Sequence, residues 1–340
     1  PTVVLNFDRA KGYLVGEKNK GLEYMFTYMN TARVGIAIQG LCHSELAYQT
    51  SLPYAKERLS MRSLSGAKSP ENAADPIIVH PDVRKMLLTQ KAFSEGGRAM
   101  IYYAGKLIDE LNQCENESEK KHINDKLGFF TPILKGFLTE VGFESANQGL
   151  QVFGGHGYIK ESGLEQIVRD ARISTLYEGT TGIQGLDLLG RKVLLQRGKT
   201  LKAFTREILG FCKKHSLISG NKHKRRMNKF IWPLAKSVVS WQRHSLMIAL
   251  KARKNREIVG SASVEYLMYS GYITMAYLWA RMAQVANEKI AEKPENIEFY
   301  RAKVRTAEFY FERIFPRAKA LAKSMTANPR SLMRMTSVQF

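Results

Sequence analysis

Hydrophobic residues recur with the period of an α-helix along most of this chain. Within residues 22–57, Met25, Met29, Ile36 and Leu41 are spaced so that they fall close to one face of a helix. The same period predicts helices over residues 81–111, over 127–150, near 163–170, and from 179 through 194. Four long helices with few strands predict an antiparallel bundle at the centre of the fold.

Segments without this period separate the predicted helices. Residues 1–20 are typical of strand and turn, residues 59–80 are rich in Ser, Pro, Ala and Gly and predict a long loop, and the charged residues 115–126 predict a connector. Beyond Gly198 the helical period returns in a second block. Its predicted helices span about residues 200–217, 222–256, 259–287 and 295–324.

These elements predict a mainly α protein in four segments. They are a strand-like start at 1–20, a four-helix bundle at 21–198, an extra helical domain at 199–325 and a tail at 326–340. With 340 residues, 44% of them hydrophobic, the chain is long enough to bury a sizeable core.

Charge is distributed unevenly along the chain, whose formal net charge is +21. Residues 1–200 carry 25 basic and 22 acidic side chains, whereas residues 201–340 carry 27 and 9, so the second half favours an anionic partner. Two basic runs stand out, at residues 213–215 and 222–226. They are interpreted either as solvated turns or as a surface for the phosphates of a membrane or of CoA. No nucleic-acid reading motif accompanies them, so nucleic acid is not an expected partner.

Cysteine usage and hydropathy favour the cytoplasm. Cys42, Cys114 and Cys212 are widely spaced, which is typical of reduced thiols rather than of a disulfide framework. The longest uncharged apolar stretch, residues 266–280, is too short to span a bilayer and suits a buried helix. Peripheral contact with an anionic inner membrane is a further hypothesis, drawn from the charge of the second half alone.

Candidate chemistry is concentrated in two motifs that contain glycine. In the run RDARISTLYEGTTGIQ at 169–184, Glu178 lies between Tyr177 and a Gly179-Thr180 pair, and such uncharged neighbours suit a carboxylate that acts as a base. Upstream, the run FGGHGY at 153–158 brings the backbone close to another group, since glycine lacks the Cβ that would clash.

In this order and spacing, the two motifs resemble the C-terminal half of the acyl-CoA dehydrogenase family. The family signature reads Q-x-x-G-G-x-G-[YF], then R-D-A-[KR], then Y-E-G-T-x-x-I-Q. The matching residues are Gln151, Gly154, Gly155, Gly157, Tyr158, Arg169, Asp170, Ala171, Arg172, Tyr177, Glu178, Gly179, Thr180, Ile183 and Gln184. The second helical block resembles the C-terminal extension of the larger members, including those acting on 3-methylmercaptopropionyl-CoA. The resemblance covers nearly the whole chain, and it implies that residues 1–20 are the tail of a middle β-domain whose N-terminal half is missing.

The resemblance implies an enzyme that dehydrogenates an acyl-CoA thioester to the trans-2-enoyl-CoA with FAD. Glu178 matches the family base, which removes the α-proton while the flavin accepts hydride from the β-carbon. Its backbone N–H is the implied donor to the thioester carbonyl, and Tyr177 and Gly179 are expected beside the substrate. Some family members carry their base on an earlier helix, but Ala32 occupies that position here. The adjacent Arg33 resembles the arginine that meets the CoA moiety.

For FAD, the resemblance implies contacts in two subunits. Arg58 would reach the pyrophosphate across a dimer interface, and Gln151, Gly154 and Gly155 would lie against the adenosine diphosphate part, also in the partner. Thr180 and Gln184 would lie near the flavin of their own subunit. An ion-pair network of Arg169, Asp170 and Arg172 is expected to hold the Glu178 loop.

The implied partners are an acyl-CoA substrate, an electron-transfer flavoprotein as electron acceptor, and further copies of the chain in a homodimer or tetramer. No metal site is expected, and the implied location is a bacterial cytoplasm. Two other functions stay open. The chain as it stands is compatible with a non-catalytic helical module that dimerises and binds anions, or with an acyl-CoA oxidase, which has the same base but lets oxygen reach the flavin.

Overall fold

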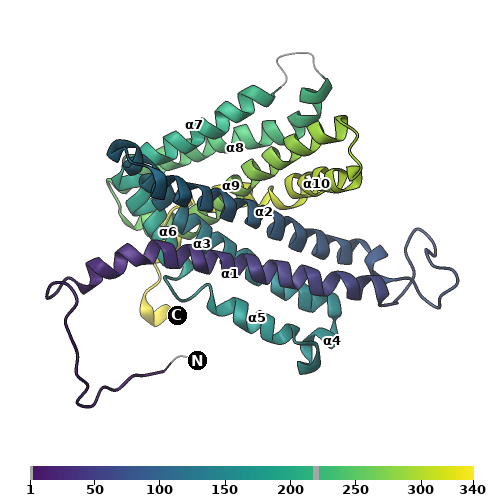
Figure 1. Cartoon of the computed structure of the whole chain (residues 1–340), viewed down its shortest axis with the longest axis horizontal. Coiled ribbons are helices and arrows are strands. Elements are labelled where there is room, and N and C mark those ends of the chain that lie inside the picture. Colours follow the sequence, from purple (N-terminus) through teal and green to yellow (C-terminus); the bar gives the residue numbers. More distant parts are fainter. Residues whose placement is uncertain (1–2, 217–221) are drawn as a thin grey trace.

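The computed structural model of the protein describes residues 3–216 and 222–340, and most of these residues lie in helices (Figure 1). The six long helices are α1 (Gly21–Glu57), α2 (Pro81–Gln113), α3 (Glu117–Phe153), α7 (Lys199–His215), α8 (Lys222–Ala252) and α9 (Glu257–Ala291). The shorter ones are α4 (Gly155–Tyr158), α5 (Leu164–Ile173), α6 (Thr181–Leu186), α10 (Ile297–Phe309), α11 (Arg317–Ser324) and α12 (Arg330–Met333). The predicted mainly α fold class is therefore confirmed.

Helices α1 and α3 run side by side in the same direction, and small residues let their backbones approach closely. A Cβ added to Gly40 would lie 2.4 Å from the carbonyl oxygen of Leu138, and one added to Gly142 would lie 2.4 Å from the carbonyl oxygen of Gly40. Further along, Gly149 faces Ala47. Helix α2 packs against both and returns in the opposite direction (Figure 1).

Helix α9 is the centre of the second block and also packs against the first. Its middle is buried, and the indole nitrogen of Trp279 donates a hydrogen bond to the carbonyl oxygen of Ala92 in α2, at 3.2 Å. Gly271 faces Phe137 of α3 so closely that a Cβ there would lie 2.2 Å from the ring. One continuous cluster of buried residues therefore runs through both helical blocks.

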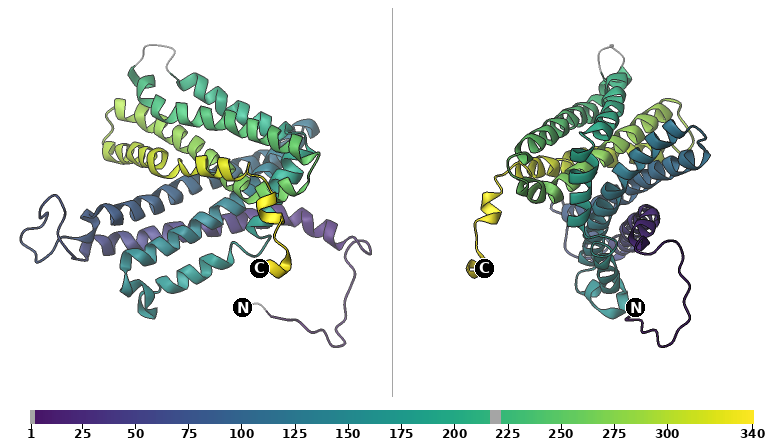
Figure 2. Two further views of the ribbon diagram at one scale, coloured as in Figure 1. Left: turned by 180° about the vertical axis from the view of Figure 1, so that it is seen from behind. Right: turned by 90° about the vertical axis from the view of Figure 1, so that its left-hand side faces the viewer.

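The predicted strand at the start of the chain is not present. Residues 3–20 form no strand; they are exposed and leave the helical body as an extended segment (Figure 2). A strand needs a neighbour to pair its backbone N–H and C=O groups, and the described part of the chain offers this segment none. The exposed side chains include Val4 and Phe7.

The predicted connector at 115–126 is also wrong, because α3 begins at Glu117. Asn116 caps this helix: its side-chain oxygen accepts hydrogen bonds from the N–H groups of Ser118 (3.0 Å) and Glu119 (3.1 Å). The acidic residues that looked like a solvated linker lie in the first turn, where negative charge is favourable near the helix N-terminus.

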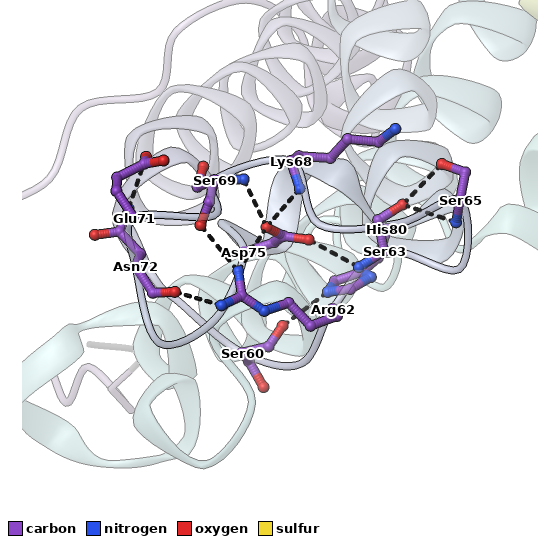
Figure 3. Close-up of polar contacts among 10 residues, drawn as sticks. All are labelled: Ser60, Arg62, Ser63, Ser65, Lys68, Ser69, Glu71, Asn72, Asp75 and His80. Carbon is purple, nitrogen blue, oxygen red and sulfur yellow. Dashed lines mark hydrogen bonds and ion pairs between the residues drawn. The ribbon is translucent and has the colours of Figure 1, made fainter.

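Residues 59–80 form an ordered loop around the buried carboxylate of Asp75, which we call the Asp75 loop (Figure 3). The carboxylate accepts hydrogen bonds from the N–H groups of Ser63 (2.9 Å), Lys68 (2.8 Å) and Ser69 (2.8 Å), and from Arg62 (3.1 Å). The N–H of Ser63, and after it the other donors, hold the pKa of Asp75 well below its usual range even though burial acts the other way.

Other predicted features have mixed outcomes. Cys42, Cys114 and Cys212 are free thiols. None of the helices in the described residues combines the length and the apolar character that a bilayer crossing requires. Of the two basic runs, residues 213–215 end α7, whereas most side chains of the run at 222–226 lie outside the described residues.

Candidate active site

The loop between α5 and α6 carries Glu178 in an unusual backbone conformation. Its φ is +56°, in the left-handed region, and Gly179 follows with a φ of +95°. Such a conformation costs a residue with a Cβ on the order of 1–2 kcal/mol, so surrounding contacts must impose it. At Gly179 a side chain is also excluded by space, because a Cβ would lie 2.6 Å from the amide nitrogen of Gln184.

Three side chains from three helices hold the carbonyl groups of this turn. The Glu178 carbonyl accepts hydrogen bonds from Nε of Arg33 (3.4 Å) and from Nε2 of Gln184 (3.1 Å). The Gly179 carbonyl accepts one from Nζ of Lys135, at 2.6 Å. Because α1, α3 and α6 each supply one donor, the turn is positioned by the packing of the bundle rather than by its own residues.

Both ends of the turn are also anchored. Thr180 caps α6, its hydroxyl accepting a hydrogen bond from the N–H of Ile183 at 3.3 Å, and Thr181 donates to Glu140 of α3 at 2.5 Å. On the other side, the Tyr177 hydroxyl donates to the side-chain oxygen of Gln39 in α1. Burial raises the pKa of Tyr177, the hydrogen bond between Tyr177 and Gln39 acts against this shift, and the negative charge of Glu178 adds to it.

The functional groups of Glu178 itself are left available. The residue is half-buried, and neither its carboxylate nor its backbone N–H has a hydrogen-bond or ion-pair partner among the residues that the structure describes. A base with no competing partner sits directly beside a backbone donor with no acceptor, and this arrangement suits the removal of a proton next to a carbonyl group.

Lys135 is the nearest buried cation to this turn, and motif matching did not single it out. Its side chain is fully buried. Burial, followed by the nearby positive charge of Arg33, lowers the pKa of Lys135 to about 8, although the carboxylates of Glu140 and Glu178 act in the opposite direction. A sequence signal did exist, because Lys135 is the one charged residue in the apolar run at 127–138 of α3.

Arg33, predicted to meet CoA, is buried and already engaged. Besides its bond to the Glu178 carbonyl, its guanidinium forms an ion pair with Asp187 at 3.3 Å. Asp187 follows α6 directly, at the start of a π-helical stretch, Asp187–Leu195. The contacts observed for Arg33 therefore fasten α1 to the Glu178 turn and to the segment after it.

The expected ion-pair network next to this turn is not observed. Arg169, Asp170 and Arg172 are all described, and no ion pair joins them. Asp170 instead accepts a hydrogen bond from Gln166 (2.7 Å), and Arg172 donates to the hydroxyl of Thr175. These bonds stay within α5 and its last turn; all three charged residues are exposed, and the Arg172 guanidinium lies 5.7 Å from the centre of the Phe143 ring.

The second predicted group lies at the far end of the bundle, where α1 and α3 end together. The rings of Tyr54 and Phe153 stack with centroids 3.8 Å apart, and the Tyr54 hydroxyl lies 3.3 Å from Nδ1 of His156. Beyond these rings, four predicted residues are exposed: Arg58, Gln151, Gly154 and Gly155. Gly154 has a φ of +60°, and nothing lies within 4 Å of where a Cβ would be at Gly154 or Gly155.

The structure thus brings the predicted site residues together in two groups rather than one. Arg33, Tyr177, Glu178, Gly179, Thr180 and Gln184 form the Glu178 site. Arg33 lies in α1 and Arg58 directly follows its last residue, so the two are about 37 Å apart along the helix, at 1.5 Å per residue. Among the described residues no cluster of His, Cys, Asp or Glu could hold a metal ion.

Comparison with known proteins matches both helical blocks. The family model described as "Acyl-CoA dehydrogenase, C-terminal domain" matches residues 19–194, and the one described as "Acetyl-CoA dehydrogenase C-terminal like" matches residues 204–336. The 3-methylmercaptopropionyl-CoA dehydrogenase of Ruegeria pomeroyi is 37% identical over 98% of this chain and 55% of its own length. The broad-specificity linear acyl-CoA dehydrogenase of Mycobacterium tuberculosis is 29% identical over 97% of this chain and 55% of its own.

The fold has solved counterparts as well. The crystal structure of an acyl-CoA dehydrogenase from Bacillus anthracis, complexed with FAD, aligns with a TM-score of 0.62 at 20% identity, covering 94% of this chain and 55% of that one. The chain therefore spans about half the length of the relatives it matches.

Proposed function

Because this chain belongs to the acyl-CoA dehydrogenase family, we propose that it supplies the base of an FAD-dependent acyl-CoA dehydrogenase. The reaction is the oxidation of an acyl-CoA thioester to the trans-2-enoyl-CoA, with Glu178 removing the α-proton. The observation that carries this proposal is the Glu178 turn, whose backbone is held by Arg33, Lys135 and Gln184. There the carboxylate and the N–H of one residue lie side by side, and neither has a partner in the part of the chain that the structure describes.

The chain's own residues have distinct roles in this proposal. The N–H of Glu178 donates to the thioester oxygen, which stabilises the negative charge that develops there as the α-proton leaves. The Glu178 carboxylate accepts that proton. Tyr177 and Gly179 flank the reacting atoms, and the left-handed backbone of Glu178 lets its carboxylate and its N–H serve one substrate group.

The two groups of residues fit FAD, which when bound supplies the acceptor for the β-hydride. At the far end of α1, the exposed guanidinium of Arg58 and the open backbone at Gly154 and Gly155 suit a pyrophosphate. In the Glu178 site, the side-chain oxygen of Gln184 is buried and accepts no hydrogen bond from the described residues, so it remains available to a ligand donor.

The separation of these groups supports a homodimer or tetramer as the active assembly. Gln184 binds the same carbonyl group as Arg33, and Arg33 is about 37 Å from Arg58 along α1. One bound dinucleotide is therefore too short to contact Arg58 and Gln184 of the same chain. We propose that Arg58, Gln151, Gly154 and Gly155 contact the FAD whose flavin lies near Thr180 and Gln184 of another copy. An electron-transfer flavoprotein is the proposed electron acceptor.

The test is flavin reduction by acyl-CoA without oxygen. The flavin-loaded protein is mixed with 3-methylmercaptopropionyl-CoA, butyryl-CoA and palmitoyl-CoA, and loss of the yellow absorbance is followed for wild type, Glu178→Gln and the exposed control Glu161→Gln. We expect bleaching by one substrate class, a rate lowered roughly 10²–10⁴-fold in Glu178→Gln, and no change in Glu161→Gln.

Other outcomes separate the remaining functions. Equal bleaching in wild type and Glu178→Gln would show that Glu178 is not the base. A protein that never retains FAD would favour the non-catalytic module. Rapid consumption of oxygen after reduction, with no need for an electron-transfer flavoprotein, would identify an oxidase.

A further inference from the structure

Two adjoining cavities lie on the side of the molecule where α2 meets α9 and α10, and none of their lining residues belongs to the Glu178 site. The first, which we call the basic cavity, has a volume of about 640 Å³. The second, the apolar cavity, has a volume of about 510 Å³. They share Tyr103, Lys106 and Arg281 in their walls, so the two cavities are direct neighbours with different linings.

The basic cavity has an excess of positive charge that the protein does not neutralise. Its charged lining residues are Lys106, Lys126, Lys214 and Arg281 against Glu110 and Glu207. Both carboxylates are already paired with lysines of the same cavity: Glu207 accepts from Lys126 at 2.7 Å, and Glu110 pairs with Lys106.

Glu207 is fixed further by two tyrosines. It accepts hydrogen bonds from the hydroxyls of Tyr103 (2.9 Å) and Tyr277 (3.1 Å). In the described part of the chain, Arg281 and Lys214 have no carboxylate partner. Arg281 is exposed, with its guanidinium 5.5 Å from the centre of the Tyr277 ring. Arg281 contacts Tyr277, but neither cation is committed to a carboxylate of the described residues, so both can pair with an external anion.

The apolar cavity continues from Arg281 along α9 toward α10. Its walls are mainly aliphatic and aromatic, and the side chains that form it include Tyr102, Leu278, Met282, Val285 and Phe299. Val285 is 50% exposed and Phe299 53% exposed, so these side chains are open to a ligand rather than buried in the core. Lys303 at its edge is paired with Glu95 at 2.9 Å.

A ligand that satisfies both halves needs an anionic head and an apolar tail. Both volumes lie within the range of small-molecule sites, and a guanidinium pairs with a carboxylate through two parallel hydrogen bonds. A nucleotide fits less well, because its polar base would meet the apolar walls. We propose that the two cavities bind the anion of a straight-chain fatty acid, with its carboxylate at Arg281 and its chain in the apolar cavity.

The experiment is equilibrium dialysis of the flavin-loaded protein against octanoate, decanoate and dodecanoate below their micellar concentrations. We expect one saturable site whose Kd tightens roughly tenfold for each two carbons added, because each methylene leaves water. Dodecyltrimethylammonium, with the same tail and the opposite charge, is expected not to bind.

Variants locate the site. Arg281→Gln is expected to weaken dodecanoate binding roughly tenfold through the loss of a charged hydrogen-bond donor, and Val285→Asp to weaken it at least as much by placing a negative charge beside the chain. The exposed Arg206→Gln, on α7 but outside both cavities, serves as the matched control. Glu178→Gln is expected to bind dodecanoate like wild type, and Arg281→Gln to keep the flavin reduction of wild type.

Several results would overturn the proposal. They are a lack of saturable binding, wild-type affinity in both Arg281→Gln and Val285→Asp, or loss of dodecanoate binding in Glu178→Gln, which would place the ligand in the active site. Binding to vesicles of anionic phospholipid with none to monomeric dodecanoate would also contradict it, because the surface would then recognise a membrane rather than a single chain.

Discussion

At the scale of single residues, Lys135 is the side chain whose role contrasts most with its appearance in the sequence. It is a cation buried in the middle of α3, where desolvation opposes its charge, yet its ammonium group donates the shortest of the three bonds to the carbonyl groups of the Glu178 turn. Its hydrogen bond to the Gly179 carbonyl explains why a lysine lies at this position despite the desolvation of its charge. We therefore regard Lys135 as a positioning residue for Glu178.

Replacement of Lys135 tests this role. Lys135→Met keeps an unbranched, slightly shorter side chain that cannot donate a hydrogen bond, and it leaves the Gly179 carbonyl with only the long contact to Gln184, at 3.5 Å. We expect flavin reduction by acyl-CoA to slow by roughly 10–100-fold because the base is less well placed. Stopped-flow absorbance measures the rate, and Lys135→Arg should recover part of it. A rate unchanged in Lys135→Met would show that the turn is held without this bond.

The same residue predicts a dependence of stability on pH. Burial lowers the pKa of Lys135 from 10.5 to about 8, so between these values the unfolded chain binds a proton that the folded chain has lost. The free energy of unfolding should therefore gain a rising contribution from about pH 8 to 10.5. Urea titrations at pH 7.5 and 9.5 should show this rise in wild type and in Lys120→Met, a surface control on the same helix, and a smaller rise in Lys135→Met.

At the scale of secondary structure elements, the contact between α1 and α3 depends on glycine. Gly40 and Gly35 lie on the same helix, but a Cβ at Gly40 would clash with the Leu138 carbonyl, whereas nothing lies within 4 Å of one at Gly35. Gly40→Ala should lower the free energy of unfolding by about 1–3 kcal/mol through overpacking. Gly35→Ala should raise it by about 0.5–1 kcal/mol, since alanine favours the helix. Chemical denaturation measures both, and equal effects would contradict this packing.

The Asp75 loop is a second element with a testable organisation. Asp75→Asn keeps the shape of the side chain but removes the charge that three N–H groups and Arg62 stabilise. We expect trypsin to cleave faster after Arg62 or Lys68 in this variant, with the helical circular dichroism unchanged. Glu71→Gln, an exposed residue of the same loop, is the control. Resistance to trypsin in Asp75→Asn would mean that the loop is ordered by other contacts.

At the scale of the whole molecule, the two helical blocks are joined by one core and by a salt bridge. The Arg317 guanidinium of α11 binds both oxygens of Glu144 in α3, at 2.8 and 2.9 Å, next to the hydroxyl of Tyr272 in α9 at 3.3 Å. The boundary predicted between residues 198 and 199 stays a prediction, but the buried cluster crosses it. We therefore expect the blocks to unfold together.

Calorimetry tests this coupling. A single cooperative transition is expected for wild type, and Arg317→Met should lower the free energy of unfolding by about 1–2 kcal/mol, because the bond is charge-assisted but partly exposed. Arg301→Met, which removes a surface pair with Glu298 inside α10, should change it by less. Two separated transitions would show that the blocks fold as independent domains.

The sequence by itself determined the helical architecture and the family. Helical period is a local property, so most of the long helices could be placed within a few residues of their observed bounds; the exception is α3, which begins at Glu117 and not near residue 127. The motifs at 151–158 and 169–184 were sufficient to identify the family, because their residue types and their spacing are specific to it. The prediction failed at residues 117–126, because a charged, exposed segment has the same composition in a linker and in a helix. Here the segment is helical from Glu117, and Asn116 caps the helix.

Only the tertiary structure decided how the Glu178 turn is held and where the other predicted ligand residues lie. Arg33 is 145 positions from its partner Glu178 in the chain, and Lys135 is 44 positions from Gly179, so no local pattern connects them. The same holds for Arg281, which reaches the wall of both cavities because α2, α7, α9 and α10 pack there. A helical period and a sequence motif involve residues that are close together in the sequence. A functional site depends instead on which distant side chains the packed helices bring within bonding distance.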